Sequence, residues 1–430
     1  MKKISQLGLT GRQLLLKGII YLVLGAFLML TGSFLPVVGL KFILLIWQLL
    51  AIFDFVSAIF GKKRSPDNFL VLLFKILILG YLLTSNFTTN VPIFLTAILV
   101  GVYLIFASFI NLVTYYLYLK DNIRPRSRYL IDGVWLVLLG IASFLSTTGD
   151  SEMQFLVVGI YLFMYGLTNI RDGIFFESEI GKNNLKRRTR IPLPLAIAAL
   201  IPRRTLQKIN DYLLENSEEN IEKHYNVQKI SAIPDLEIFI HVTKDGFGAI
   251  GHVDLCYEDV VISYGNYDET SQRFFNMMGD GVLLKAGRES YIEFCKEESH
   301  KTLLGYGIIL TKEQRFAVEE RLSQLDKLTV PWIPSNEPVS KDTDGKKDVM
   351  YAYKMTERLG ARFFKFKESK FKTYFVLSTN CVLLADSIIG KAGTDILSAK
   401  GFISPGTYQN YLDREFEKPH SIVISKSIYQ

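Results

Sequence analysis

The sequence predicts two unlike parts, an all-α transmembrane bundle over residues 1–180 and a soluble α+β domain over residues 236–430. The first part consists of long apolar runs separated by short polar loops, whereas Lys, Glu and Asp occur throughout the last part. Charge divides the chain similarly, because residues up to Arg190 include 19 Lys and Arg against 9 Asp and Glu, and the remainder 30 against 33. We therefore attribute the basic excess to membrane topology, and we expect no nucleic-acid partner.

Six apolar runs approach the length of about 20 residues that crosses the hydrocarbon core of a bilayer. They predict spans near 18–34, 39–60, 68–84, 92–116, 129–146 and 153–173. The loops near 61–67 and 117–128 and the segment after residue 174 carry Lys and Arg, whereas the three loops that alternate with them carry none. The positive-inside rule then predicts a multi-pass protein of the inner (cytoplasmic) membrane with both termini in the cytoplasm.

The six spans form three hairpins of one design. GIIYLVLGAFLMLTG, KILILGYLLTS and GVWLVLLGIASFLST are glycine-punctuated first helices, and glycines at helical spacing let helices pack closely. This pattern resembles the HdeD-like family of small bacterial membrane proteins. The resemblance implies a packed membrane module, and it leaves open the association of copies of the chain through these helices.

Residues 181–235 are predicted to link the two parts. KNNLKRRTR is strongly basic, and IPLPLAIAALIP after it is apolar but too short to span a bilayer. We expect this stretch to lie at the membrane interface and residues 203–226 to form an amphipathic helix.

The last part mixes short strands with helices. Apolar runs rich in Val, Ile and Tyr predict strands at LEIFIHV, AIGHVDLCY, VVISYG and KTYFVLSTN. Helices are predicted at RESYIEFCKEE, at KEQRFAVEERLSQL after a Thr311 cap, and at CVLLADSII ending at Gly390. Residues 335–348 are expected to form a polar loop. Regular βαβ alternation is missing from this pattern, which favours an α+β fold.

Cys381 is the residue that the sequence singles out as a nucleophile. It follows a predicted strand and opens a helix, and Ser378, Thr379 and Asn380 before it are capping candidates. The positive end of a helix favours a thiolate, and N–H groups of the first turn can meet a developing oxyanion. His252, in the strand GHVDLCY, could serve as its base. We also expect Asn380 to contact substrate.

The other cysteines and histidines fit this chemistry less well. Cys256 and Cys295 are expected to be packing residues, and the three irregularly spaced cysteines predict neither a disulfide framework nor a metal site. No cofactor is expected. His224, His300 and His420 occur in polar stretches, and His241 lies in a strand without a neighbouring glycine.

The order of these residues is similar to that of the circularly permuted papain-like thiol enzymes, which include lecithin:retinol acyltransferase-like and YiiX-like proteins. A glycine-preceded His252 comes first, the Asn-Cys pair at the start of a helix comes more than 100 residues later, and ISPGTYQNYL follows. The resemblance covers residues 236–415. It implies acyl transfer or hydrolysis through an acyl-thioester on Cys381, with His252 as base.

The residue that orients His252 depends on the turn after its strand. A two-residue turn at Glu258-Asp259 would bring Ser263 to the face that carries His252, and a turn one residue longer would bring Tyr264 there instead. Because Glu-Asp lacks the Gly or Asn that two-residue turns favour, we prefer the longer turn and Tyr264 as the third catalytic residue.

The sequence thus predicts a membrane-anchored cytoplasmic cysteine hydrolase or acyltransferase. Its expected partners are membrane lipids and an acyl-bearing substrate, because tethering raises the local concentration of a membrane substrate. Three alternatives remain open: a cysteine peptidase or amidase, a non-catalytic membrane stress or immunity protein, and a small transporter with a regulatory domain.

Overall fold

The computed structural model describes residues 11–60, 66–145, 152–174, 227–242, 251–297, 302–336, 338–341, 347–390 and 404–429, with a few positions between 201 and 207. The chain divides into two compact units. One contains Leu16–Leu112 and Ser127–Asn169, and the other contains Met1–Leu15, Val113–Arg126 and Ile170–Gln430. Most of the predicted linker, including residues 182–190 and most of 203–226, lies outside the described residues.

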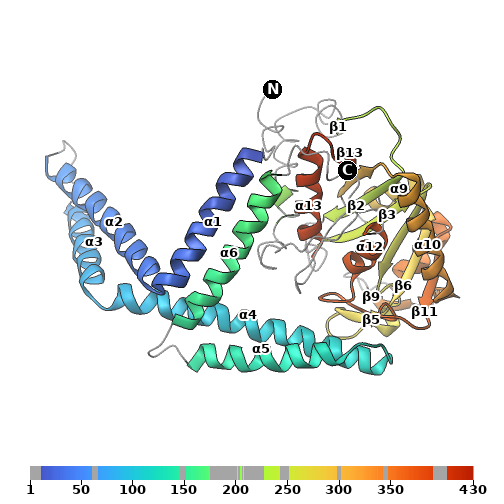
Figure 1. The fold of residues 1–430 in the computed structure, drawn as a ribbon, viewed down its shortest axis with the longest axis horizontal. Helices are drawn as coiled ribbons and strands as arrows, with labels where there is room; N and C mark the ends of the chain where they lie inside the picture. The colour runs from blue at the N-terminus through green and yellow to red at the C-terminus, as the bar shows by residue number, and fades with distance from the viewer. Residues whose placement is uncertain are drawn as a thin grey trace. The chain divides into compact units, whose positions relative to one another are not determined.

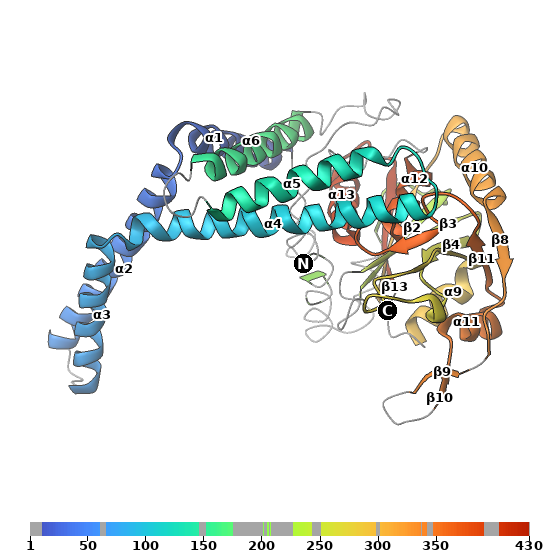
Figure 2. The same cartoon turned by 90° about the horizontal axis from the view of Figure 1, so that it is seen from below.

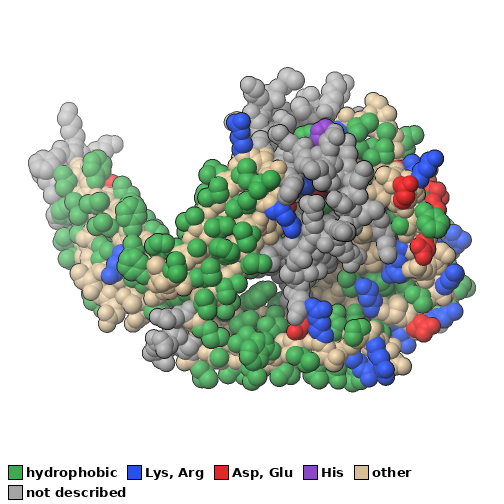
Figure 3. All heavy atoms as spheres, in the orientation of Figure 1, with side chains coloured by type: hydrophobic (Ala, Val, Ile, Leu, Met, Phe, Trp, Pro, Cys, Tyr) green, Lys and Arg blue, Asp and Glu red, His purple; other side chains and the backbone are tan. Residues whose placement is uncertain are grey.

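The membrane part consists of apolar helices. Within the described residues they are α1 (Gly11–Thr31), α2 (Phe34–Phe60), α3 (Pro66–Thr84), α4 (Phe87–Lys120), α5 (Ser127–Leu145) and α6 (Glu152–Ile174). All except α3 are long and apolar enough to cross a membrane, and the apolar stretch Val71–Thr84 of α3 is shorter. A multi-pass helical membrane part is therefore confirmed, with five candidate spans where the sequence predicted six. Figure 3 shows hydrophobic side chains gathered over these helices and charged ones over the sheet-bearing unit.

The helix pairs that pack differ from the three predicted hairpins. Helix α2 packs on α3, and α4 lies beside α5 (Figures 1 and 2), where the Ser143 hydroxyl donates to the Ala97 carbonyl. A Cβ atom on Gly25 of α1 would lie 2.7 Å from the Gly159 carbonyl oxygen of α6, so glycines let these two backbones approach. The glycine pattern thus indicates close packing, but the partners are not the helices joined within each predicted hairpin.

The second unit is built on a nine-stranded sheet (Figure 1). Its strands are, in spatial order, β1 (Val227–Gln228), β13 (Val423–Tyr429), β7 (Thr302–Ile308), β2 (Leu236–Val242), β3 (His252–Tyr257), β4 (Val260–Gly265), β6 (Val282–Gly287), β11 (Arg362–Phe366) and β8 (Thr329–Trp332). Every neighbouring pair is antiparallel. This unit contains the predicted strands and helices, so an α+β unit after the membrane helices is confirmed.

Helices cover both faces of the sheet. One core joins the sheet to α10 (Lys312–Lys327), α12 (Cys381–Ile389) and α13 (Pro405–Glu417), and the other joins it to α9 (Arg288–Glu297) and α11 (Tyr351–Leu359). The predicted Thr311 cap of α10 is confirmed as a capping box with Gln314. Cys381 belongs to the first core and the central strands β3 and β4 contact α12, so the sheet positions the nucleophile candidate.

The turn between β3 and β4 has two residues, so the longer turn preferred from the sequence is wrong. Tyr257 pairs with Val260, and Glu258 and Asp259 between them have φ angles of 49° and 60°. Both residues adopt the left-handed backbone conformation that the twist of a two-residue hairpin requires, although neither is Gly or Asn. Continued along the strands, this register puts Ser263 on the face that carries His252 and turns Tyr264 to the opposite face.

The segment predicted as a polar loop at 335–348 also differs from expectation. It includes β9 (Pro338–Lys341) and most of β10 (Lys347–Val349), which pair as a small antiparallel hairpin. Its strands are short and polar, so the alternation of apolar residues that reveals a half-buried strand is missing.

Candidate functional site

Cys381 is the first residue of α12, and the residues before it fix that position. The Asn380 side-chain oxygen accepts a hydrogen bond from the Leu383 backbone N–H (3.0 Å), and its nitrogen donates to the Val376 carbonyl (2.9 Å). The predicted cap is therefore confirmed for Asn380. Because the oxygen and the nitrogen of this side-chain amide both form hydrogen bonds to backbone groups, Asn380 positions the cysteine. A substrate contact by its side chain stays a prediction.

The structure brings His252 and Cys381 together. The Cys381 sulfur lies near enough to the His252 imidazole and to the Tyr374 phenol, on β12 (Thr373–Phe375), to raise the pKa of both groups. His252 is the first residue of β3 and its side chain is 25% exposed, whereas Cys381 is only 4% exposed. The thiol is thus enclosed, with a more open imidazole beside it.

A buried carboxylate holds the imidazole. The Nε2 atom of His252 lies 2.8 Å from Oδ1 of Asp254, which is 1% exposed. The other oxygen, Oδ2, lies 2.5 Å from Nε2 of His241 and accepts a hydrogen bond from the Tyr291 hydroxyl (2.6 Å). Two histidines therefore share one aspartate, and the two rings meet edge to face with centroids 5.3 Å apart.

Ser263 is the second residue that contacts His252 on this face. Its hydroxyl lies 2.9 Å from Nε2 of His252 and 2.5 Å from the hydroxyl of Tyr267. The Nε2 atom of His252 thus contacts both Asp254 and Ser263. The side chains that orient the imidazole are therefore Asp254 and Ser263.

Tyr264, the third residue predicted from the sequence, has a different place. Its hydroxyl donates to the Phe371 carbonyl (2.9 Å), and its ring packs against Tyr374 with centroids 5.4 Å apart. Tyr264 thus packs against Tyr374 and does not contact His252. The carboxylate beside His252 belongs to Asp254. The signal for Asp254 was its spacing of two residues from His252, which puts both on one strand face.

The ionisable groups of the site reinforce one another's charge. Burial alone would lower the pKa of His252, but the Asp254 carboxylate and the Cys381 sulfur raise it to about 10. Burial alone would raise the pKa of Asp254, but the imidazoles of His252 and His241 hold it well below its ordinary value. Charged His252 therefore stabilises the folded state at pH values below about 6.5, and this contribution is lost as the pH rises through about 10.

Gly251 gives His252 its backbone position. Its φ is +92°, which L side chains rarely adopt, and an added Cβ would lie 3.0 Å from Cβ of Pro405 and 3.1 Å from the His241 carbonyl oxygen. The glycine before the histidine thus lets β3 begin against the start of α13.

Replacing Gly251 with Ala is expected to lower the free energy of unfolding by about 1–3 kcal/mol and to slow alkylation of Cys381, because His252 must shift. Gly360→Ala is the matched control, since Gly360 also has positive φ (+63°) but nothing within 4 Å of an added Cβ. Pulse proteolysis and iodoacetamide labelling measure the two effects. Equal labelling rates in Gly251→Ala and wild type would show that Gly251 does not position the site.

The remaining cysteines and histidines lie apart from this chemistry. Cys256 and Cys295 are 4% and 1% exposed in the second core, and burial raises the pKa of Cys256 to about 12. His420 is exposed, and His224 and His300 lie outside the described residues. Among the residues that the structure describes, no three His, Cys, Asp or Glu side chains are arranged to hold a metal ion.

The site combines a thiol at a helix N-terminus, an imidazole within its reach and a carboxylate behind the imidazole, a combination suited to nucleophilic catalysis. Comparison with protein-family models, curated proteins and solved structures finds no match to this chain.

Proposed function

We propose that this chain is a membrane-anchored cysteine hydrolase or acyltransferase that forms an acyl-thioester on Cys381. The observation that carries the proposal is the Cys381 thiol at the N-terminus of α12, near a His252 imidazole whose Nε2 atom lies 2.8 Å from buried Asp254. An imidazolium beside a sulfur stabilises the thiolate, which is the nucleophilic form.

In the proposed reaction, the thiolate attacks the carbonyl carbon of an ester or amide, and the carbonyl oxygen becomes an oxyanion. In this proposal, backbone N–H groups at the start of α12 donate hydrogen bonds to that oxyanion. The imidazolium of His252 then gives its proton to the leaving alcohol or amine, and the acyl group remains on sulfur. Water or an acceptor alcohol, deprotonated by the same imidazole, releases the acyl group and restores the thiol.

The chain order also supports a permuted papain-like arrangement for the soluble unit. His252 precedes Cys381, α12 packs on β3 and β4, and ISPGTYQNYL supplies Ser404 and Pro405, which begin α13 beside Gly251. We propose this fold by analogy with that family, because order and packing match its pattern.

A lipid is the substrate that the tether favours. Helices able to cross a membrane hold the enzyme at a bilayer, and tethering raises the effective concentration of substrates in that bilayer. The alternation of basic loops supports a cytoplasmic location for the soluble unit and both termini.

Lipid profiles of cells that express the wild-type chain or Cys381→Ala test the assignment. We expect a wild-type-specific change in acyl-chain distribution, and Cys295→Ala, in which another buried cysteine is removed, should behave as wild type. An unchanged profile together with Cys381-dependent cleavage of a peptide amide would establish the peptidase alternative. An unchanged profile with no Cys381-dependent turnover would favour the non-catalytic alternative.

A further inference from the structure

The loop between β4 and β6 ends in an aromatic tip. Arg273 and Met278 form an isolated antiparallel bridge, and the chain turns back between them through Phe274 and Phe275. These two phenylalanines are 61% and 83% exposed. Adjacent exposed phenylalanines at a turn are unusual on a soluble surface, and they mark a contact with an apolar partner.

The backbone of this tip is held in a costly conformation. Phe274, Phe275 and Asn276 have φ angles of 56°, 54° and 63°, all in the left-handed region. Asn tolerates that region, but Phe is disfavoured there, and Gly or Asn would serve a purely structural turn better. The two phenylalanines therefore adopt a backbone conformation that their residue type disfavours, and such strain is concentrated at functional positions.

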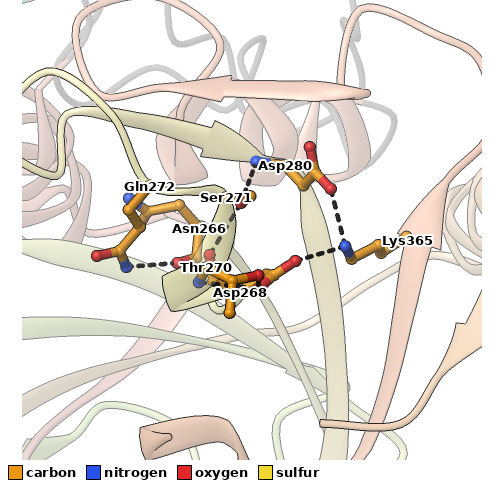
Figure 4. Close-up of polar contacts among 7 residues, drawn as sticks. All are labelled: Asn266, Asp268, Thr270, Ser271, Gln272, Asp280 and Lys365. Carbon is orange, nitrogen blue, oxygen red and sulfur yellow. Dashed lines mark hydrogen bonds and ion pairs between the residues drawn. The ribbon is translucent and has the colours of Figure 1, made fainter. Parts of the chain in front are cut away.

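A polar cluster makes the base of the tip rigid (Figure 4). The Asn266 side chain donates to the Asn276 carbonyl (2.7 Å), and the Ser271 hydroxyl accepts from the Asp280 backbone N–H (2.9 Å). Lys365 binds the carboxylates of both Asp268 (2.5 Å) and Asp280 (2.8 Å). The aromatic tip is thus presented on a braced support.

The same base is bonded to the segment that leads to Cys381. Strand β5 (Met278–Asp280) pairs with β12, and the Val376 N–H donates to the Met277 carbonyl (2.9 Å). Val376 in turn accepts a hydrogen bond from Asn380, the cap residue next to the cysteine. The tip is therefore joined by hydrogen bonds to the segment that carries Cys381.

A basic side chain accompanies the tip. Arg273 adjoins Phe274 and is exposed. Aromatic residues flanked by Lys and Arg suit the interface of an anionic bilayer, where rings enter the acyl boundary and cations meet phosphates. Because the same chain carries helices able to cross a membrane, the tip stays close to a bilayer.

We propose that the Arg273–Met278 tip docks on the lipid bilayer, with Phe274 and Phe275 inserted at the boundary between headgroups and acyl chains. This docking does not require that Cys381 be catalytic. It adds a second attachment of the soluble unit to the membrane, beside the covalent link to the apolar helices.

Site-directed fluorescence on the full chain in nanodiscs with anionic lipid tests the proposal. Phe275→Cys is made in a Cys381→Ala background and labelled with a nitrobenzoxadiazole dye, since Cys256 and Cys295 are buried. Phe316→Cys is the matched control, because Phe316 is 69% exposed but lies on α10. Phe274→Cys gives a second, independent label on the tip.

Labels on the tip are expected to be quenched by spin-labelled lipids at least about twofold more than the label at 316, and to be protected from aqueous iodide, since interfacial insertion reaches about 5–10 Å. Quenching by iodide at 274 and 275 equal to that at 316 would overturn the proposal. Protection from both quenchers would also overturn it, because protein would then cover the tip. Catalytic turnover is absent in this background, so the result stands apart from the proposed reaction.

Discussion

Substitution of Cys381 by Ala is expected to reduce turnover of an activated acyl ester by at least about 1,000-fold, because the nucleophile that splits the reaction into two steps is lost. The wild-type chain in nanodiscs should release 4-nitrophenol from a 4-nitrophenyl acyl ester in a burst followed by a slower steady state. Mass spectrometry of the quenched burst should find the acyl group on the peptide that contains Cys381, and hydroxylamine should remove it.

The controls separate nucleophilic chemistry from packing. Cys295→Ala removes a thiol that is 1% exposed in the other core, and it should keep both the burst and the adduct. His252→Gln should keep Cys381 but lose the adduct, since no base remains beside the sulfur. An adduct on Cys256 or Cys295, or a burst that survives in Cys381→Ala, would refute the assignment of the nucleophile.

Replacing Asp254 with Asn is expected to lower the turnover rate by about 10²–10⁴-fold and the free energy of unfolding by about 1–3 kcal/mol. The carboxylate accepts a hydrogen bond from the Tyr291 hydroxyl and contacts both His241 and His252. The side-chain amide of the variant would instead point an N–H group at one or more of these three hydrogen-bond donors. The pKa of His252 should fall below about 10, because the negative charge of Asp254, which raises this pKa, would be removed while burial would still lower it.

The pH dependence of turnover and the imidazole ¹³C shifts of His252 measure that fall. Asp326→Asn is the control, since Asp326 pairs with Lys285 at the surface and is 49% exposed; it should leave both measurements unchanged. If Asp254→Asn loses stability but keeps the pKa of His252, the carboxylate serves the fold alone and does not tune the base.

Local signals predicted most elements of the soluble unit. The Asn380 cap, the start of α12 and the strand of His252 all follow from residues within a few positions, where capping and periodicity act. The contact between His252 and Cys381 was predicted only through the order of residues in a resembling family, because nothing local joins two positions so far apart.

The orienting residues could not be chosen in the same way. The choice between Ser263 and Tyr264 depended on a turn whose Glu258 and Asp259 adopt left-handed angles that their residue types do not favour. His241 was set aside because its own neighbours carry no signal, yet the sheet brings it to Asp254 from an adjacent strand. Long-range pairing decides such contacts, and the sequence alone does not reveal it.

The position of the thiol in the chain also orders events during synthesis. Cys381 follows His252 by 129 residues (381 − 252), which a ribosome adds in about 6–26 s at rates of about 5–20 residues per second. Throughout that interval the nascent chain holds His252 and Asp254 but lacks Cys381. Strand β13 emerges later still, so β7 keeps an open edge that a neighbouring chain could occupy. In the proposed reaction, acyl transfer therefore begins only after the apolar helices have been made, and a chain stalled before residue 381 lacks the proposed nucleophile.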